Sequence, residues 1–278
     1  MAQETTLTLM SSMTQALSDA VALRYSTIMS PIEQCFNVVY LQPGSGDLAV
    51  KFPVAPTGMA FSTVTDGDIF TAHDAGAMSA VTITPVPYEL QVAVNEQAII
   101  SNPAGYVSVL ADKFAQAAHT LVMGLVSTAI SDDGTVGGST GADMTTAILA
   151  ADIGVLRGKG VSGQINAVLH PAAYTQLATN AGNIATFGRA GAAAVDGAPM
   201  FSLYGANIYM DSGIGNDGTD YKNFIGAQTA IGIAMGTPTG IKFLQLDASH
   251  IVVAASILVG VDSVSTVEYL WEKTDYEG

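Results

Sequence analysis

The sequence predicts a mixed α+β fold with helices and strands in irregular order. Three features lead to this prediction: a long apolar helical pattern over residues 103–130, short alternating apolar runs before and after it, and a C-terminal part, residues 239–273, with the pattern of two or three long strands. The chain has no internal repeat and no linker that would separate independent domains. Its 278 residues suffice for a sizeable core.

The N-terminal region predicts a short amphipathic helix over residues 10–25. Met10, Met13 and Leu17 follow one another at spacings of three and four, which places them on one helical face. Pro31 is expected to end this region.

Residues 36–84 are expected to form an extended β-hairpin. Strand-type runs at 36–41 and 48–54 are joined by a turn sequence of Pro, Gly and Asp. A polar, glycine-rich stretch follows, and strand-type alternation resumes over 80–94. An isolated hairpin is marginally stable in water, and this one has little apolar surface of its own to bury. We therefore expect it to depend on contacts outside itself.

The clearest predicted element is a helix over residues 103–130. Asn102 can cap it, Pro103 suits its first position, and Gly134 is expected to end it. A helix of this length would extend roughly 42 Å at 1.5 Å per residue. Its apolar residues lie on more than one face, so we expect it to be buried against a sheet and neighbouring elements.

Shorter elements follow this helix. A Gly/Ser/Thr loop covers 133–142, and a second helix is expected to start at Asp143 and to stop at Gly158 and Gly160. The remaining predictions are a buried strand at 165–169, a helix at 171–181, a strand within 205–213, a turn after it, and a single strand at 223–235.

Charge and composition disfavour nucleic-acid binding and favour association. The chain has 24 acidic and 9 basic residues, a net charge of −15, and the basic residues are scattered rather than clustered as contacts to phosphate require. Only 12% of the residues are charged and 49% are apolar. With so few charges to cover the surface, we expect much of it to meet other subunits.

Cys35 is the only cysteine, which excludes an intrachain disulfide and a thiolate metal cluster and fits a reducing cytoplasm. The first residues lack the pattern of a secretory signal. Two uncharged stretches, 114–131 and 223–241, are too polar, too short or too rich in glycine and proline for a membrane span. We expect no contact with a membrane.

The histidines do not form a recognisable site. His170 follows an apolar run and precedes Pro171, which favours extended backbone, so we interpret it as a strand-to-helix junction rather than a base without a nearby partner. His73, His119 and His250 lack metal-ligand spacing. For His119 we expect a position on the helix face, with a backbone or solvent partner.

The remaining motifs have simpler interpretations than chemistry. The run GIGNDG at 213–218 matches a dinucleotide-binding pattern, but no helix follows it to bind a phosphate, so it is interpreted as a turn. The acidic residues in loops do not match a calcium-binding register and are expected to be solvated: Asp132, Asp133, Asp143, Asp211, Asp217 and Asp220. The sequence thus predicts no catalytic, cofactor-binding or metal-ligating residue and no enzyme.

The order of these elements resembles the major capsid proteins of tailed bacteriophages, which have the Hong Kong 97-type fold. The resemblance lies in an ordered pattern from about residue 80 to the C-terminus, with a plausible hairpin arm before it, and no single motif decides it. The stretches that carry it are AVTITPVPYELQVAVNEQAIIS, YVSVLADKFAQAAHTLVMGLV, INAVLHPAAYTQLATNAGN, PMFSLYGANIYMDSGI and NFIGAQTAIGIAM.

The resemblance implies a division of the chain. In order, it implies an N-terminal arm (1–35), an extended β-hairpin loop (36–84), a peripheral domain (85–142) with a spine helix at 103–130, an axial domain (143–240), and C-terminal strands (241–278) that return to the peripheral and axial domains. We expect no covalent cross-link between subunits.

The function that the resemblance implies is that of a major capsid protein. Such a chain self-assembles as pentamers and hexamers into the icosahedral head that encloses a tailed phage's double-stranded DNA without sequence-specific contacts. It is part of the virion and assembles in the host cytoplasm. The implied partners are further copies of the chain, a separate scaffolding protein, a portal, and a cement or decoration protein. No cofactor is implied.

Three alternatives stay open at this point. An encapsulin-type bacterial compartment shell has the same fold, and a groove for a cargo peptide would favour it. A hydrolase or other ligand-binding enzyme with a dispersed site would show a well-formed pocket with convergent polar groups. A secreted adhesin or surface-layer protein is weakened by the missing signal.

Overall fold

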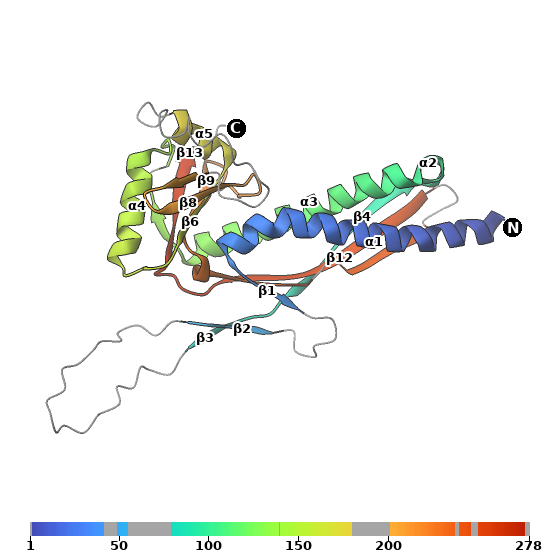
Figure 1. Ribbon diagram of the computed structural model, residues 1–278, viewed down its shortest axis with the longest axis horizontal. Helices are drawn as coiled ribbons and strands as arrows, with labels where there is room; N and C mark the ends of the chain where they lie inside the picture. Colours follow the sequence, from blue (N-terminus) through green and yellow to red (C-terminus); the bar gives the residue numbers. More distant parts are fainter. Residues whose placement is uncertain are drawn as a thin grey trace, which may run out of the picture.

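The computed structural model describes residues 2–41, 49–54, 79–138, 140–179, 201–236, 239–245 and 250–275. Within them the molecule is elongated: two long helices lie beside a sheet at one end, and a compact helix–sheet unit lies at the other (Figure 1). The helices are α1 (Ala2–Cys35), α2 (Glu96–Ser101), α3 (Pro103–Asp133), α4 (Thr146–Gly158) and α5 (Pro171–Thr179).

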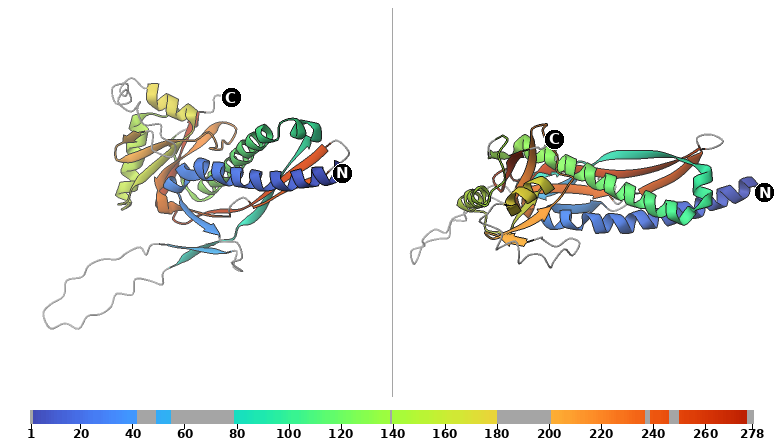
Figure 2. Two further views of the ribbon diagram at one scale, coloured as in Figure 1. Left: turned by 45° about the vertical axis from the view of Figure 1, so that its right-hand side comes forward. Right: turned by 90° about the horizontal axis from the view of Figure 1, so that it is seen from above.

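A five-stranded sheet underlies α1 and α3. Its order is β1–β10–β12–β11, with β4 on the other side of β12. These strands are β1 (Asn37–Leu41), β4 (Val86–Asn95), β10 (Ile231–Gly236), β11 (Thr239–Gln245) and β12 (His250–Ser263). Figure 2 shows α1 and α3 side by side along this sheet. Their apolar contacts with it include Leu17, Phe114 and Val253, so the helices cover one sheet face.

A six-stranded sheet forms the compact unit, in the order β5–β13–β9–β6–β8–β7. These strands are β5 (Thr135–Gly137), β6 (Ile165–Leu169), β7 (Phe201–Leu203), β8 (Ala206–Met210), β9 (Asp220–Ala227) and β13 (Tyr269–Asp275). One face packs on α4 and α5 through residues such as Leu149 and Leu177. The other face meets the C-terminal half of α3 through Phe224 and Trp271.

A two-stranded ribbon, β2 (Val50–Pro53) and β3 (Ala80–Ile83), leaves the five-stranded sheet on the side opposite the helices (Figure 1). The strands are antiparallel, with Val50 opposite Ile83.

The long helix is confirmed from cap to end. The Asn102 side chain accepts a hydrogen bond from the Gly105 N–H at 3.1 Å, Pro103 is the first residue of α3, and Gly134 is its C-cap. Among the described helices α3 alone is long and apolar enough to span a membrane. Ten of its side chains, however, are buried within the protein.

The compact unit also agrees largely with the sequence. The buried strand β6, the helix α5 and the C-terminal strand β13 lie where they were predicted. The other two C-terminal strands, β11 and β12, also lie in the predicted region but belong to the five-stranded sheet. α4 ends at Gly158 as expected but starts at Thr146 rather than at Asp143, because the Thr145 side chain caps it by accepting from the Ile148 N–H.

The first helix is longer than predicted. α1 extends from Ala2 to Cys35, so the predicted limits, residues 10–25 with an end at Pro31, are wrong. Proline removes one helical hydrogen bond, yet Met29 and Ile32 on either side of it are 0% and 2% exposed. Their apolar packing against the core stabilises the last turns despite the proline.

Three strand predictions were wrong in detail. Residues 37–41 pair in parallel with β10 in the main sheet and are not part of a hairpin. The predicted strand at 80–94 is two strands, because the chain leaves the ribbon at Thr84 and Pro85 before joining β12 as β4. The predicted strand at 223–235 is β9 and β10, separated by a 3-10 turn and placed in different sheets.

Three short elements were not predicted. α2 follows Asn95, whose side chain accepts from the Gln97 N–H at 2.9 Å, β5 lies in the expected loop at 133–142, and β7 lies just before the strand predicted within 205–213. All three are too short to produce a periodic pattern. β5 exists because β13 provides a strand for it to pair with.

The packing around the proline generates a stability prediction. Pro31→Ala restores a backbone donor in an otherwise continuous helix and should raise the free energy of unfolding by about 1–3 kcal/mol, as measured by chemical denaturation. Ile32→Ala is the control, since a buried truncation at the neighbouring position should lower it by about 2–5 kcal/mol. Unchanged or reduced stability of the Pro31 variant would contradict this account of α1.

Candidate functional site

His170 caps a helix, which confirms its interpretation as a strand-to-helix junction. Its carbonyl accepts from the Tyr174 N–H at 2.9 Å, and its ring Nδ1 accepts from the Ala172 N–H at 3.2 Å. The ring stacks on Tyr221 at a centroid distance of 3.5 Å. Burial lowers the His170 pKa, which keeps Nδ1 available as the acceptor. These contacts give the side chain a structural role at the start of α5.

His119 has a different partner from the one expected. Its Nε2 lies 2.9 Å from the Asp211 carboxylate, so the expected backbone or solvent partner is wrong. Asp211 also accepts from the Gly213 N–H at 2.7 Å. The His119–Asp211 pair therefore ties α3 to the loop after β8.

The single cysteine, Cys35, is not activated. Burial, followed by the negative charge of Asp211, raises the Cys35 pKa well above its usual value, which disfavours a reactive thiolate.

The acidic residues that were considered for calcium differ in how far their side chains are exposed to solvent. The expectation of solvated side chains is wrong for Asp211 and Asp220, which are 8% and 0% exposed. Asp220 accepts from the Gly141 N–H at 2.8 Å. Asp217 accepts backbone N–H groups at 219 and 220, and these bonds lower its pKa. Residues 213–218 lie in the loop between β8 and β9, with no helix after them, and in the described part of the chain no three metal-ligating side chains gather.

His73 lies outside the described residues, and so do residues 42–48 and 55–78 of the predicted hairpin. The backbone of His250 begins β12. Among the candidates whose side chains the structure describes, no nucleophile and base are brought together into a site.

A buried carboxyl pair was missed from the sequence because its members are far apart in the chain. Glu272 on β13 is 0% exposed and Asp152 on α4 is 8% exposed. Apart from the contact between the two carboxyls, both Glu272 oxygens and one Asp152 oxygen have no hydrogen-bond partner. The Glu272 carboxyl lies directly against the backbone of Gly137 and Gly138, where a β-carbon would overlap it. Such packing leaves no space for a side chain at Gly137 or Gly138.

The two carboxyls favour sharing a proton. Burial, and then the charge of Asp152, raise the Glu272 pKa to about 8, while burial raises the Asp152 pKa to about 6. A hydrogen bond from protonated Glu272 to ionised Asp152 stabilises this arrangement. The pair links α4 to the six-stranded sheet.

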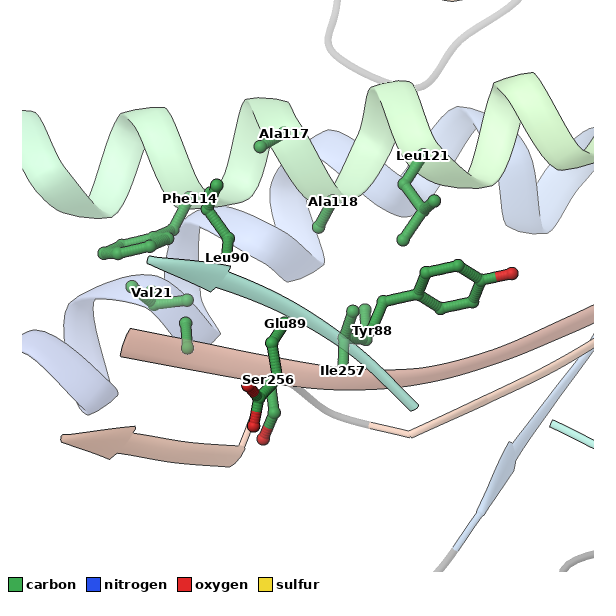
Figure 3. A pocket seen from close by; sticks show the side chains of 11 residues that line it. Val21, Tyr88, Glu89, Leu90, Phe114, Ala117, Ala118, Leu121, Ser256 and Ile257 are labelled. Carbon is green, nitrogen blue, oxygen red and sulfur yellow. The ribbon is translucent and has the colours of Figure 1, made fainter. Parts of the chain in front are cut away.

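An apolar groove lies between the two long helices and the sheet (Figure 3). It has a volume of about 220 Å³ and is lined by Val21 of α1, Phe114 and Leu121 of α3, and Tyr88 and Leu90 of β4. The polar side chains of Glu89 and Ser256 point away from it in Figure 3. The groove thus lacks convergent polar groups and offers only apolar contact.

The base of the ribbon is anchored on its own subunit. Phe52 and Ile83 are 1% and 4% exposed and form an apolar cluster with Ala234 and Val264. The base thus depends on contacts outside the ribbon, as expected, and these contacts are with its own subunit. Its opposite face, which includes Lys51, is exposed.

Unpaired edges and exposed apolar side chains form the remaining candidate surface. β4 pairs with β12 and has no second partner among the described strands. Val86 and Leu90 on β4 are 52% and 38% exposed, and Val39 and Tyr40 on β1, the strand at another edge of the same sheet, are 37% and 41% exposed. Open strand edges with apolar side chains favour association with further strands or subunits.

The carboxyl pair predicts an unusual pH dependence. Because the Glu272 pKa is raised from 4.5 to about 8, the folded state binds more protons than the unfolded state between these values, and stability should fall as pH rises through them. Glu272→Gln removes this titration while keeping a donor to Asp152, and should be more stable than the wild type by about 1–3 kcal/mol at pH 8. Denaturant unfolding at several pH values measures it.

Glu89→Gln is the matched control, since Glu89 is exposed on β4. It should leave the pH slope as in the wild type. A Glu272→Gln variant with the wild-type pH slope would show that the pair does not share a proton.

Comparison with known proteins bears on the fold. No protein-family model and no curated protein sequence matches the chain. Among solved structures, it is similar to that of Mycobacterium phage Che8 (TM-score 0.61, 17% identity, 86% of this chain and 89% of that one). It is also similar to the capsid of Ralstonia phage GP4 (0.60, 11%, 88% and 88%).

A third similar structure is the SrpI encapsulin complex from Synechococcus elongatus PCC 7942 (TM-score 0.54, 10% identity, 89% of this chain and 88% of that one). These similarities extend over most of each chain at low sequence identity. The predicted fold is confirmed: the chain has the Hong Kong 97-type capsid fold.

Proposed function

We propose that this chain is the major capsid protein of a tailed phage. Copies would assemble as pentamers and hexamers into an icosahedral head around double-stranded DNA. The observation that carries the proposal is the similarity to phage capsid structures over 86% and 88% of this chain. The function would be mechanical, without catalysis.

The proposed division of the subunit follows the predicted one. It comprises an N-terminal arm (1–35), an extended loop (36–84), a peripheral domain with α3 as its spine (85–142), an axial domain (143–240) and returning C-terminal strands (241–278). In this arrangement α1 belongs to the arm and the ribbon β2–β3 is the base of the extended loop. β1 and β10 fall within the predicted loop and axial segments but lie in the five-stranded sheet beside α3.

The extended loop is the part proposed to reach a neighbouring subunit. Its base is held by Phe52 and Ile83, while the chain between β2 and β3 continues for residues 54–79. Together with the open edges of β1 and β4, it would supply the reciprocal contacts from which rings of subunits close.

The charge distribution supports a shell that encloses DNA without gripping it. Several of the 9 basic residues are already engaged within the subunit. Arg24 pairs with Asp112 at 3.0 Å, and the Arg157 guanidinium donates to two backbone carbonyls at 2.8 Å. These two cations are thus less available to phosphate. A scaffolding protein, a portal and a decoration protein are proposed as separate partners, with assembly in the host cytoplasm.

A second candidate function is the shell of an encapsulin-type bacterial compartment. The apolar groove between α1, α3 and β4 favours it, because an apolar peptide of a cargo enzyme could bind there. The similarity to an encapsulin complex is consistent with it. Binding of a cargo peptide in this groove is the property that would distinguish an encapsulin-type shell from a phage head.

The proposed function predicts assembly. The purified chain, produced with and without a scaffolding partner, should form particles of megadalton mass or ring-shaped capsomers in sedimentation and electron microscopy. Shells that need a scaffold and then take up DNA support the phage head. A stable, monodisperse monomer under all these conditions would contradict the proposal.

The extended loop provides a second prediction. Replacing residues 55–78 by a short Gly-Ser linker should leave the subunit folded, because the apolar cores of the two large sheets and the ribbon β2–β3 are kept. The same replacement should abolish closed particles. Lys51→Ser, on the exposed face of β2, is the control and should assemble as the wild type does. Normal particles from the shortened chain, measured by sedimentation, would mean that the loop is not an assembly element.

A further inference from the structure

Two glycines form the surface on which the base of the ribbon lies. Gly232 is on β10 and Gly260 is on β12, where it pairs with Ala234. Because side chains alternate along a strand, these three residues lie on one face of the sheet, opposite the face that packs on the helices. At these three positions the face presents nothing larger than a methyl group to Phe52 and Ile83, and Val264, just after β12, completes the cluster.

The contacts across this surface are close. A β-carbon at Gly232 would lie 2.9 Å from Ile83 Cδ1 and 3.0 Å from Phe52 Cδ2. A β-carbon at Gly260 would lie 2.9 Å from Ile83 Cγ2 and 3.0 Å from Pro85 Cα. Pro85 is the residue at which the chain passes from the ribbon into β4. The ribbon base therefore packs on the sheet backbone itself.

Backbone conformation does not require glycine here. The described glycines with positive φ are elsewhere, at Gly138, Gly141, Gly160, Gly205 and Gly218. Glycine inside a strand lowers stability and often marks a close approach of another backbone. Gly232 and Gly260 are thus explained by space: a side chain at either position would occupy the place where the ribbon base packs.

We propose that Gly232 and Gly260 are positioning residues that fix the direction in which the extended loop leaves the subunit. The proposal rests on the proposed function, in which this loop reaches a neighbouring copy. The two glycines differ in the atoms that an added methyl group would meet. Gly232 meets side-chain atoms, which can move aside, whereas Gly260 also meets the backbone at Pro85, so an added methyl group there must tilt the ribbon.

The test compares three alanine variants of the full chain. Gly260→Ala should accelerate amide hydrogen exchange in β2 and β3 by about 5- to 30-fold, leave exchange in α3 unchanged, and reduce closed particles. Gly232→Ala should have a smaller effect. Gly236→Ala is the matched control on β10, since its β-carbon would lie 3.4 Å from the nearest atom, an ordinary contact.

A second substitution separates positioning from simple loss of stability. Ile83→Val removes the Cδ1 atom that a methyl group at position 232 would meet, so it should relieve Gly232→Ala in part, since Val264 Cγ2 at 2.9 Å and Phe52 Cδ2 at 3.0 Å stay in place. It keeps the branched γ-carbons, and Pro85 stays in place, so it should not relieve Gly260→Ala.

The outcomes are distinct. Exchange in Gly260→Ala equal to that in Gly236→Ala, or faster exchange throughout the protein including α3, overturns the positioning role. Loss of particles with an unchanged ribbon base also overturns it and leaves the shell function standing. A ribbon base that responds as expected in a chain whose wild type forms no particle supports the positioning role and contradicts the proposed function.

Discussion

The subunit depends on one apolar cluster that joins its two sheets through the C-terminal half of α3. Val122, Met123 and Val126 of this helix contact residues of both sheets, including Ile233 of β10 and Trp271 of β13. The last turns of α1 complete the cluster. Because the interior is close-packed, this contact holds the elongated sheet and the compact unit in one arrangement. Every surface proposed for assembly is positioned by it.

The same arrangement covers only part of the five-stranded sheet. Two long helices occupy one face, and on the other face the ribbon base covers the area around Gly232 and Gly260. The outer edges of β1 and β4 carry exposed apolar side chains. A subunit of this form buries its core alone but leaves edges that further copies could cover, which is the physical reason to propose a shell.

Local signals in the sequence predicted the parts of the fold that depend on local chemistry. Asn102, Pro103 and Gly134 define α3 because caps act within a few residues, and the uniform burial of β6 follows from its apolar run. The limits of α1 were missed because packing of Met29 and Ile32 outweighs Pro31. The separation of β9 from β10 was missed because alternation continues through both strands while the turn between them has no proline or glycine.

The candidate site was predicted less well, because its contacts join distant parts of the chain. The partner of His119 and the pairing of Asp152 with Glu272 depend on how sheets and helices pack, which no spacing reveals. The anchoring of Phe52 on Gly232 is of the same kind. His170, whose role is set by its neighbours in sequence, was interpreted correctly.

The central claim is that one copy of this chain is an incomplete object that other copies complete. A mass measurement in solution on the purified, unmodified chain, across a range of concentrations and with electron microscopy of the same samples, tests it most directly. The account predicts ring-shaped capsomers or closed particles of megadalton mass. A monomer that stays monodisperse at every concentration, with or without a scaffolding partner, would contradict it.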